Sequence, residues 1–317
     1  MLLTILMIAA SCRKDTIHVL AAEATAPETH ASPQILALYE PWFGDLKHID
    51  VGYSSQDPAV LRGQIESARR AGISAFLVDW YGVRRGPFLD NSFRLLQKAA
   101  HQSHFKVALM YDEAEDDSVN STDDALESLS RAYKDYIGPE APYHDTYLTY
   151  KGRPVVVIFP KRGKTNWNLL RERVNSWSSP PVLFYKDEAP DAFAGAFDGY
   201  YAWVHPGSAG WKADGSDWGE QYLETFYTNM TKKHPDKLAM GAAWPGFNDT
   251  RATWGLNRHM ATRCGQTFRD TMSLYHRYYD DSAPLSFLLI ETWNDYEEGT
   301  AMERADFAGC PSTSSNR

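Results

Sequence analysis

Residues 73–112, ISAFLVDWYGVRRGPFLDNSFRLLQKAAHQSHFKVALMYD, hold two strand-length apolar segments with a helical segment between them. Ile73–Tyr81 and Phe105–Asp112 are the apolar segments, and the stretch near Ser92–Gln102 has the spacing of an amphipathic helix. Apolar strands that alternate with helices are typical of parallel strands joined by crossover helices. This stretch therefore predicts a βαβ unit.

The same alternation continues on both sides of this unit. Six further strands are expected, at Ile35–Phe43, Pro154–Pro160, Val182–Asp187, Tyr200–His205, Lys237–Trp244 and Leu285–Trp293. Helices are expected at Pro58–Ala71, Ser121–Ile137, Asn166–Trp177, Asp217–Lys233 and Gly265–Tyr279, with only a helical turn near Pro190–Ala196.

Eight such strands predict a single closed (β/α)₈ barrel over residues 34–300. An open dinucleotide-binding sheet is disfavoured because no glycine-rich fingerprint opens the first helix. The last helix is expected to be incomplete, since only 17 residues follow Thr300, and residues 301–317 are expected to form a polar tail.

The composition excludes several classes of protein. With 43% hydrophobic residues and 21 Gly, the chain is neither disordered nor collagen-like. A net charge of −9, from 32 basic and 41 acidic residues, argues against nucleic acid as a partner. The three Cys residues form no CxxC motif or His/Cys cluster, so neither a metal nor another cofactor is expected. Cys264 and Cys310 could form a disulfide or remain free thiols. We expect the protein to be a monomer.

The first 33 residues have the features of an export signal followed by a tether. The apolar run that ends at Ala10 is typical of a signal peptide, although no basic segment precedes it. Ala9-Ala10-Ser11-Cys12 resembles the lipobox of bacterial lipoproteins, in which the Cys is acylated. We therefore expect export to the bacterial cell envelope or secretion, with membrane attachment only through a lipid on Cys12.

Carboxylates and aromatic rings gather where the expected strands end. In a barrel of this kind, the carboxyl ends of the strands form the active-site face. Flat aromatic rings pack against the faces of sugar rings, and carboxylates and amides bind hydroxyl groups, so the pattern predicts a carbohydrate cleft. The expected binding residues are Tyr39, Glu40, Trp42, His48, Asp79, Trp80, Tyr81, Tyr111, Asp112, Glu113, Lys186, Trp203, His205, Trp244, Asn248, Glu291, Trp293 and Asn294.

The segment Glu291–Thr300 (ETWNDYEEGT) places four acids at the end of the last strand. Glycoside hydrolysis commonly uses two carboxyl groups in different protonation states. Asp295 and Glu298 are three residues apart and can project into one cavity, whereas Glu297 is expected to point away. We predict Glu298 as the protonated acid and Asp295 as the ionised partner.

Three motifs resemble those of glycoside hydrolase family 99, the endo-α-mannosidases and endo-α-mannanases. Residues 39–44 (YEPWFG) are similar to its Tyr-Tyr-x-Trp-Tyr-Gly, and residues 71–82 (AGISAFLVDWYG) to its Ala-Gly-Ile-Asp-x-Phe-x-x-Ser-Trp-Trp-Gly. His48, followed by Ser55-Gln-Asp-Pro58, resembles a further segment. Residues 293–300 (WNDYEEGT) resemble both the family 99 motif Asn-Glu-Trp-His-Glu-Gly-Thr and the Trp-Asn-Asp-Tyr-Gly-Glu-Ser motif of family 71, the α-1,3-glucanases.

The resemblance implies a metal-free (β/α)₈ enzyme that cleaves an α-linked glycan within the chain. Glu298 matches the acid that protonates the leaving oxygen in both families, and Asp295 matches the second acid. Family 99 has a Glu at the second position, which is thought to take a proton from the sugar 2-hydroxyl, whereas Asp agrees with family 71. Tyr39 matches a substrate-contacting Tyr, and Asp112 or Glu113 could be the acid expected on the third strand.

Two other functions remain compatible with the sequence. A surface lipoprotein could bind glycans without cleaving them, and a barrel enzyme could modify or assemble polysaccharides. New reducing ends would separate hydrolysis from binding alone, and a requirement for an activated sugar donor would indicate assembly.

Overall fold

The computed structural model describes residues 32–116, 119–162, 164–205 and 217–303. The expected signal, lipobox and tether up to residue 31 lie outside these residues, as does most of the expected tail. Within the described ranges, no helix has the length and apolar character needed to cross a membrane.

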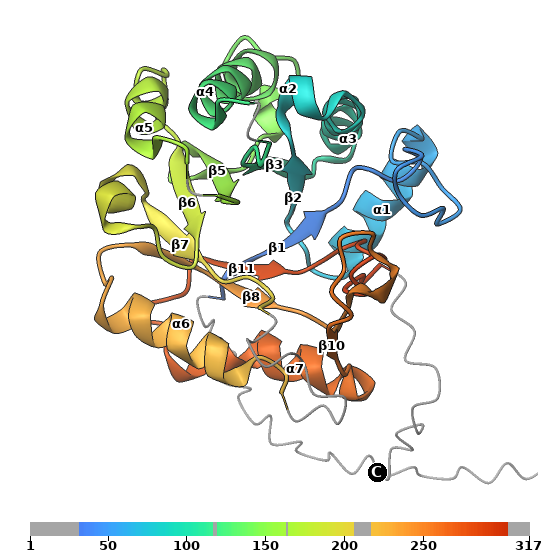
Figure 1. The fold of residues 1–317 in the computed structure, drawn as a ribbon, viewed down its shortest axis with the longest axis vertical. Helices are drawn as coiled ribbons and strands as arrows, with labels where there is room; N and C mark the ends of the chain where they lie inside the picture. The colour runs from blue at the N-terminus through green and yellow to red at the C-terminus, as the bar shows by residue number, and fades with distance from the viewer. Residues whose placement is uncertain (1–31, 117–118, 163, 206–216, 304–317) are drawn as a thin grey trace, which may run out of the picture. The chain divides into compact units, whose positions relative to one another are not determined.

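Eight parallel strands close into a barrel, which confirms the predicted (β/α)₈ fold (Figure 1). Each strand pairs with the next along the chain, and β11 returns to pair with β1. The strands are β1 (Gln34–Tyr39), β2 (Ala75–Trp80), β3 (Lys106–Asp112), β5 (Arg153–Phe159), β6 (Val182–Lys186), β7 (Gly199–Tyr201), β8 (Leu238–Ala243) and β11 (Phe287–Ile290).

The helices follow their strands as expected, apart from the short α2, which the sequence did not predict, and they cover the outside of the barrel. They are α1 (Pro58–Arg70), α2 (Gly82–Arg85), α3 (Pro87–Ser103), α4 (Ser121–Ala132), α5 (Trp167–Asn175), α6 (Glu220–Lys232) and α7 (Gln266–Ser273). The short fifth connection is a 3₁₀ helix, Asp191–Ala196. Between β11 and residue 303 the chain forms turns and no helix. The residues in which a last helix would follow lie outside the described ranges, so the incomplete last helix stays a prediction.

Helix boundaries follow local capping chemistry. The Asp57 side chain accepts a hydrogen bond from the Ala59 amide, and Pro58 supplies the fixed φ of a first helical residue. Asn120 caps α4 by accepting from the amides of Thr122 and Asp123, so the cap lies immediately before Ser121, the expected first residue of the helix. A π turn, Tyr133–Ile137, extends α4 to the predicted end.

Two small features were not expected from the sequence. β4 (Thr149–Tyr150) pairs antiparallel with the start of β5, and β9 (Phe247–Asn248) pairs with β10 (His259–Met260) beyond β8. Strands of two residues are too short to produce a periodic pattern. The β9–β10 pair nevertheless matters, because the chain between these strands reaches the mouth of the barrel.

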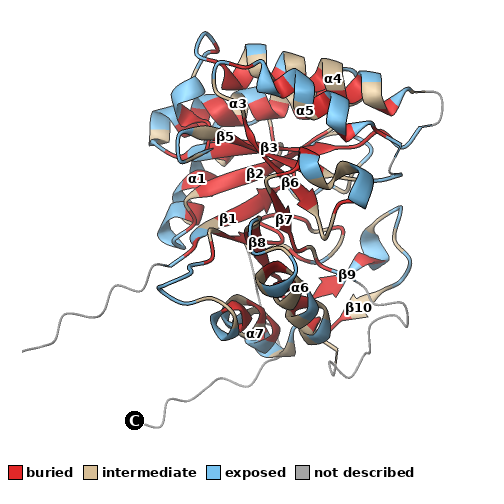
Figure 2. Cartoon of the chain, turned by 90° about the vertical axis from the view of Figure 1, so that its left-hand side faces the viewer, coloured by how far each residue is buried: buried red, intermediate tan, exposed pale blue. Residues whose placement is uncertain are grey.

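The strands are buried and the helices are exposed on their outer faces (Figure 2). Every residue of β2 is buried, as expected for a parallel strand with side chains packed on both faces. Cys264 is disulfide-bonded. The other two cysteines, Cys12 and Cys310, lie outside the described residues, so the pairing of Cys264 with Cys310 stays a prediction.

Phe287 tests how much the barrel depends on its last strand. Its ring is fully buried and contacts the rings of Tyr150 and Phe184. Phe287→Ala is expected to lower the free energy of unfolding by about 3–5 kcal/mol, because it leaves a cavity in a close-packed interior. Urea unfolding measures this loss. Leu169→Ala on α5, where the side chain is 45% exposed, should change it by only about 0.5 kcal/mol, and equal losses in the two variants would contradict the packing.

Candidate active site

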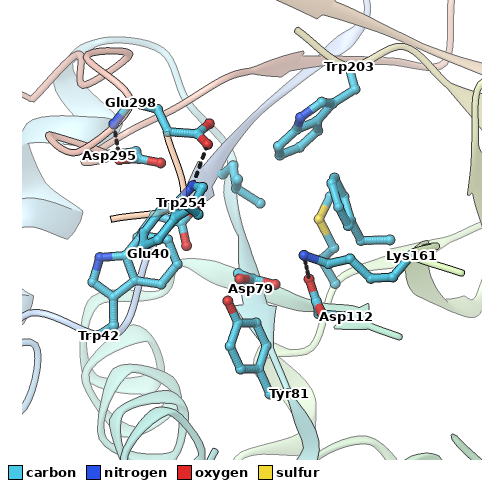
Figure 3. A pocket seen from close by; sticks show the side chains of 13 residues that line it. Glu40, Trp42, Asp79, Tyr81, Asp112, Lys161, Trp203, Trp254, Asp295 and Glu298 are labelled. Carbon is cyan, nitrogen blue, oxygen red and sulfur yellow. Dashed lines mark hydrogen bonds and ion pairs between the residues drawn. The ribbon is translucent and has the colours of Figure 1, made fainter. Parts of the chain in front are cut away.

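A cavity of about 270 Å³ opens at the carboxyl ends of the strands (Figure 3). Acids and aromatic rings dominate its wall. The lining residues are Leu38, Glu40, Trp42, Asp79, Tyr81, Met110, Asp112, Phe159, Lys161, Trp203, Trp254, Asp295 and Glu298.

A second cavity of about 310 Å³ adjoins the first. It is lined by Phe159, Lys186, Asp187, Trp203, Val204, His205, Phe247, Arg258 and Glu298. Phe159, Trp203 and Glu298 belong to both walls, so these three side chains lie where the cavities meet. Together the two cavities have the size of a ligand site.

Hydrogen bonds within the loop after β11 fix Asp295. Its amide donates to Thr292 Oγ1 at 2.7 Å, and its Oδ1 accepts from the amides of Glu297 and Glu298, each at 2.8 Å. The same turn therefore holds Asp295 and directs Glu298 toward the cavity.

Trp254, between β9 and β10, reaches across to Glu298. Its Nε1 donates to Glu298 Oε1 at 2.8 Å. Trp254 is not predicted from the sequence, because it lies in the loop between β9 and β10 and not at the end of an expected strand. The indole hydrogen bond of Trp254 engages one oxygen of Glu298. Trp254 lines the first cavity, and Glu298 lines both.

Glu297 points away from the cavities. Its Oε2 is 2.8 Å from His48 Nδ1, and its Oε1 accepts from the Ile49 amide at 3.3 Å. The His48 ring in turn stacks on Trp42, with centroids 4.6 Å apart. Glu297 and His48 thus hold Trp42 against the cavity wall.

Glu40 is held by Asn294 across the β1–β11 pair. The Glu40 amide donates to Asn294 Oδ1 at 2.7 Å, and Asn294 Nδ2 donates to the Glu40 carbonyl at 2.9 Å. Asn294 therefore positions a cavity residue while its own amide stays buried.

Lys161, after β5, supplies positive charge to the first cavity. Its Nζ is 3.1 Å from Asp112 Oδ2 and 3.3 Å from Glu115 Oε1. The neighbouring Glu113 is buried below this loop, where it accepts hydrogen bonds from the amides of Lys161, Arg162 and Thr165. Of the two acids proposed for the third strand, Asp112 lines the cavity and Glu113 supports the loop.

Burial in this acid-rich space raises the pKa of its carboxyl groups. Burial, followed by neighbouring carboxylates, raises the pKa of Glu40 and Asp79 well above the usual range. Burial also raises the pKa of Asp112, to about 6, against the opposing effect of Lys161.

Asp295 and Glu298 influence each other's protonation. Burial and the nearby Glu298 raise the pKa of Asp295 well above its usual value, and the two backbone donors offset part of this rise. Burial raises the pKa of Glu298, and the Trp254 hydrogen bond opposes it. A charge on either group disfavours a charge on the other, so the two carboxyls titrate as a pair, and an ionised Asp295 stays a prediction.

The structure divides the predicted binding residues into two groups. Those that line a cavity are Glu40, Trp42, Asp79, Tyr81, Asp112, Lys186, Trp203 and His205, together with Asp295 and Glu298. Those that line neither are Tyr39, His48, Trp80, Tyr111, Glu113, Trp244, Asn248, Glu291, Trp293 and Asn294.

Strand alternation explains much of this division, because successive side chains point to opposite faces. Glu40, Asp79 and Asp112 face the barrel mouth. Their strand neighbours Tyr39, Trp80 and Tyr111 face the helices, and their polar atoms hydrogen-bond to Gln64, Asp90 and Asp124 respectively. The alternation was present in the sequence and could have separated these residues.

Loop contacts account for the other residues outside the lining. Trp244 donates to the Trp218 carbonyl, Glu291 accepts from the Val204 amide, and Trp293 packs on Phe76. Asn248 caps the 3₁₀ turn that follows it, and its side chain accepts from Thr250.

No group of three or more His, Cys, Asp or Glu residues in the described part of the chain is arranged to hold a metal ion.

Comparison with known proteins gives a match to solved structures only. No family model and no curated protein sequence matches the chain. Two structures of a family 99 endo-α-mannosidase from Bacteroides thetaiotaomicron, one of them in complex with bis-tris-propane, are similar to it, with TM-scores of 0.63 and 0.61. Their identities are 19% and 18%; the matches cover 88% and 84% of this chain and 89% and 86% of those chains.

A third structure, described as a glycoside hydrolase-like protein, has a TM-score of 0.60 at 16% identity, over 87% of this chain and 88% of that one. At these identities the likeness shows the fold. The resemblance to family 99 that the motifs indicated is thus confirmed for the fold, because the family 99 structures share this barrel.

The raised carboxyl pKa values predict how stability depends on pH. The folded protein retains protons that the unfolded chain releases near pH ~4, so the free energy of unfolding should fall as pH rises from ~4 through the raised pKa values. For Asp112 that value is about 6, and for Glu40 and Asp79 it is also raised.

Asp79→Asn should be more stable than the wild type at neutral pH and should lose less stability over this range, because the amide cannot ionise. Urea unfolding at several pH values tests this. Glu66→Gln, which changes an exposed acid on α1, should follow the wild-type curve. If the free energy of unfolding instead rose with pH, by the same amount in the wild type and both variants, the raised pKa values of the buried acids would be contradicted.

Proposed function

We propose that the protein is a glycoside hydrolase that cleaves an α-linked glycan, such as an α-mannan or an α-glucan, within its chain. The observation that carries the proposal is the position of Glu298. Among the described residues, it is the carboxyl group that lines both adjoining cavities. An acid at this junction would lie beside the bond between a sugar unit in one cavity and a unit in the other.

The coupled acids supply the required chemistry. Because a charge on one disfavours a charge on the other, the pair favours a state in which one of Asp295 and Glu298 holds a proton and the other is ionised. When the proton is on Glu298, its Oε2, which is not engaged by Trp254, can deliver it to the leaving oxygen. Asp295 is then ionised and can act as the second carboxylate of the pair.

The aromatic residues suit a sugar ligand. Trp42, Trp203 and Trp254 line the first cavity, and Phe159 and Trp203 continue into the second. Flat rings beside carboxylates can pack against sugar C–H faces while the oxygens accept hydrogen bonds from hydroxyl groups. The cleft therefore has groups that can bind both the C–H faces and the hydroxyl groups of a pyranose.

Cleavage within an α-linked chain is supported by two independent likenesses. The motif at residues 293–300 resembles those of families 99 and 71, and the fold is similar to that of a family 99 endo-α-mannosidase. Asp295 in place of Glu agrees with the family 71 pattern, so both α-mannan and α-1,3-glucan belong among the substrates to be tested.

Glu298→Gln tests the assigned acid. The amide keeps the size of the side chain but cannot donate the proton, so release of new reducing ends from a cleaved glycan should fall at least ~100-fold. Binding of the same glycan, measured by calorimetry, should persist. α-Mannan, α-1,3-glucan and high-mannose glycans form the substrate panel.

Glu297→Gln is the matched control in the same loop, because Glu297 contacts His48 rather than the cavity. It should retain most of the activity. Unchanged hydrolysis by Glu298→Gln would refute the role of Glu298. Wild-type binding without any new reducing ends would instead indicate a glycan-binding protein.

We also propose that the protein is exported and lipidated on Cys12, a proposal supported by the apolar run and the lipobox-like residues 9–12. In a bacterium that processes lipoproteins, mass spectrometry should find an N-terminal acylated Cys12 in the membrane fraction. Cys12→Ser should abolish the modification and release the protein from the membrane. An unmodified Cys12 inside an intact N-terminal segment would refute the proposal.

A further inference from the structure

Glu40 and Asp79 form a pair of buried acids beside the proposed catalytic carboxyls. The parallel register of β1 and β2 pairs Leu38 with Leu77 and Tyr39 with Val78, and its continuation places Glu40 next to Asp79. Both side chains line the first cavity and point into it (Figure 3). They are only 4% and 7% exposed.

Each of these acids has an oxygen without a hydrogen-bond partner. Glu40 Oε2 and Asp79 Oδ1 are buried and make no hydrogen bond within the described structure. Buried polar atoms in folded proteins are almost always satisfied, so two such oxygens on neighbouring strands point to a ligand that donates hydrogen bonds to them.

The charge around the pair favours a cation. The charged groups that face Glu40 are Asp79, Asp112, Asp295 and Glu298, and those that face Asp79 include Asp112 and Lys161. Among the described lining residues of this cavity, Lys161 is the single cationic side chain, and it is already paired with Asp112 and Glu115. The cavity thus holds five carboxyl groups and lacks matching positive charge.

A metal ion does not fit these oxygens, because no three acidic or imidazole groups of the described chain converge in a metal-binding arrangement. An ammonium group carried on a sugar ring does fit. It has three N–H donors for the unpartnered oxygens and a positive charge for the acids.

We propose that Glu40 and Asp79 form a subsite for an amino sugar, a sugar unit with a protonated primary amine. The inference rests on the proposed function, since it names the class of glycan that the hydrolase takes. A neutral sugar could donate hydroxyl hydrogen bonds to the two oxygens, but it would bring no positive charge to a wall whose carboxyl groups outnumber its single Lys161. The two acids also stand where the family 99 motifs have Tyr and Ser, so the subsite belongs to this chain's own sequence.

Binding of simple glycosides to the Glu298→Gln variant tests the subsite without turnover. The probes are methyl 2-amino-2-deoxy-α-D-glucopyranoside, its N-acetylated form, the uncharged methyl α-D-glucopyranoside, and the corresponding mannose series. Calorimetry should show that the amino glycosides bind at least ~10-fold tighter than their neutral counterparts. Added salt should weaken this preference, because it arises from charge.

Two charge-removing variants locate the effect. Glu40→Gln and Asp79→Asn, each made in the Glu298→Gln background, should reduce the preference for the amine to a small factor. Glu66→Gln in the same background removes an exposed acid outside the cavity and should leave the preference intact. The comparison of ligands on the Glu298→Gln variant itself remains decisive if either double variant fails to fold.

The outcomes separate this inference from the proposed function. Equal affinity for amino and neutral glycosides would overturn the amino-sugar subsite, even if the wild type hydrolyses a neutral glycan. A strong amine preference that Glu40→Gln and Asp79→Asn do not change would also overturn it. A preference that depends on these two acids, found in a protein that releases no reducing ends, would keep the subsite and refute the hydrolase.

Discussion

Closure of the barrel fixes which side chains reach the mouth. Once β11 pairs with β1, every strand must place alternate residues inside and outside, because no free edge allows the register to slip. This constraint directs Glu40, Asp79 and Asp112 into the cavity and turns Tyr39, Trp80 and Tyr111 toward the helices. The chemistry of the site follows from this alternation.

The same constraint concentrates buried acids at the barrel mouth, which lowers the stability of the folded protein. Glu40, Asp79, Asp112, Asp295 and Glu298 all have raised pKa values, so their ionised forms oppose folding at neutral pH. The packed barrel below them offsets this cost. Groups that destabilise the empty protein are expected at a functional site, where a ligand or a reaction makes use of them.

The repeated alternation of strands and helices made the barrel predictable, including its cramped fifth unit. The acidic loop after β11 was predictable because its acids follow an apolar strand. Trp254 could not be found in this way, since its approach to Glu298 depends on the two-residue strands β9 and β10. The protonation states of the acids could not be predicted from the sequence either, because the pKa of Asp295 depends on how deeply the loop is buried.

Hydrolysis of a glycosidic bond by Asp295 and Glu298 is tested most directly by digestion of the glycan panel in ¹⁸O-labelled water, followed by mass spectrometry of the products. We predict that the wild-type protein releases oligosaccharides with one ¹⁸O atom at the new reducing end and that Glu298→Gln does not. Intact glycans, or cleaved products without the label at early times, would contradict hydrolysis.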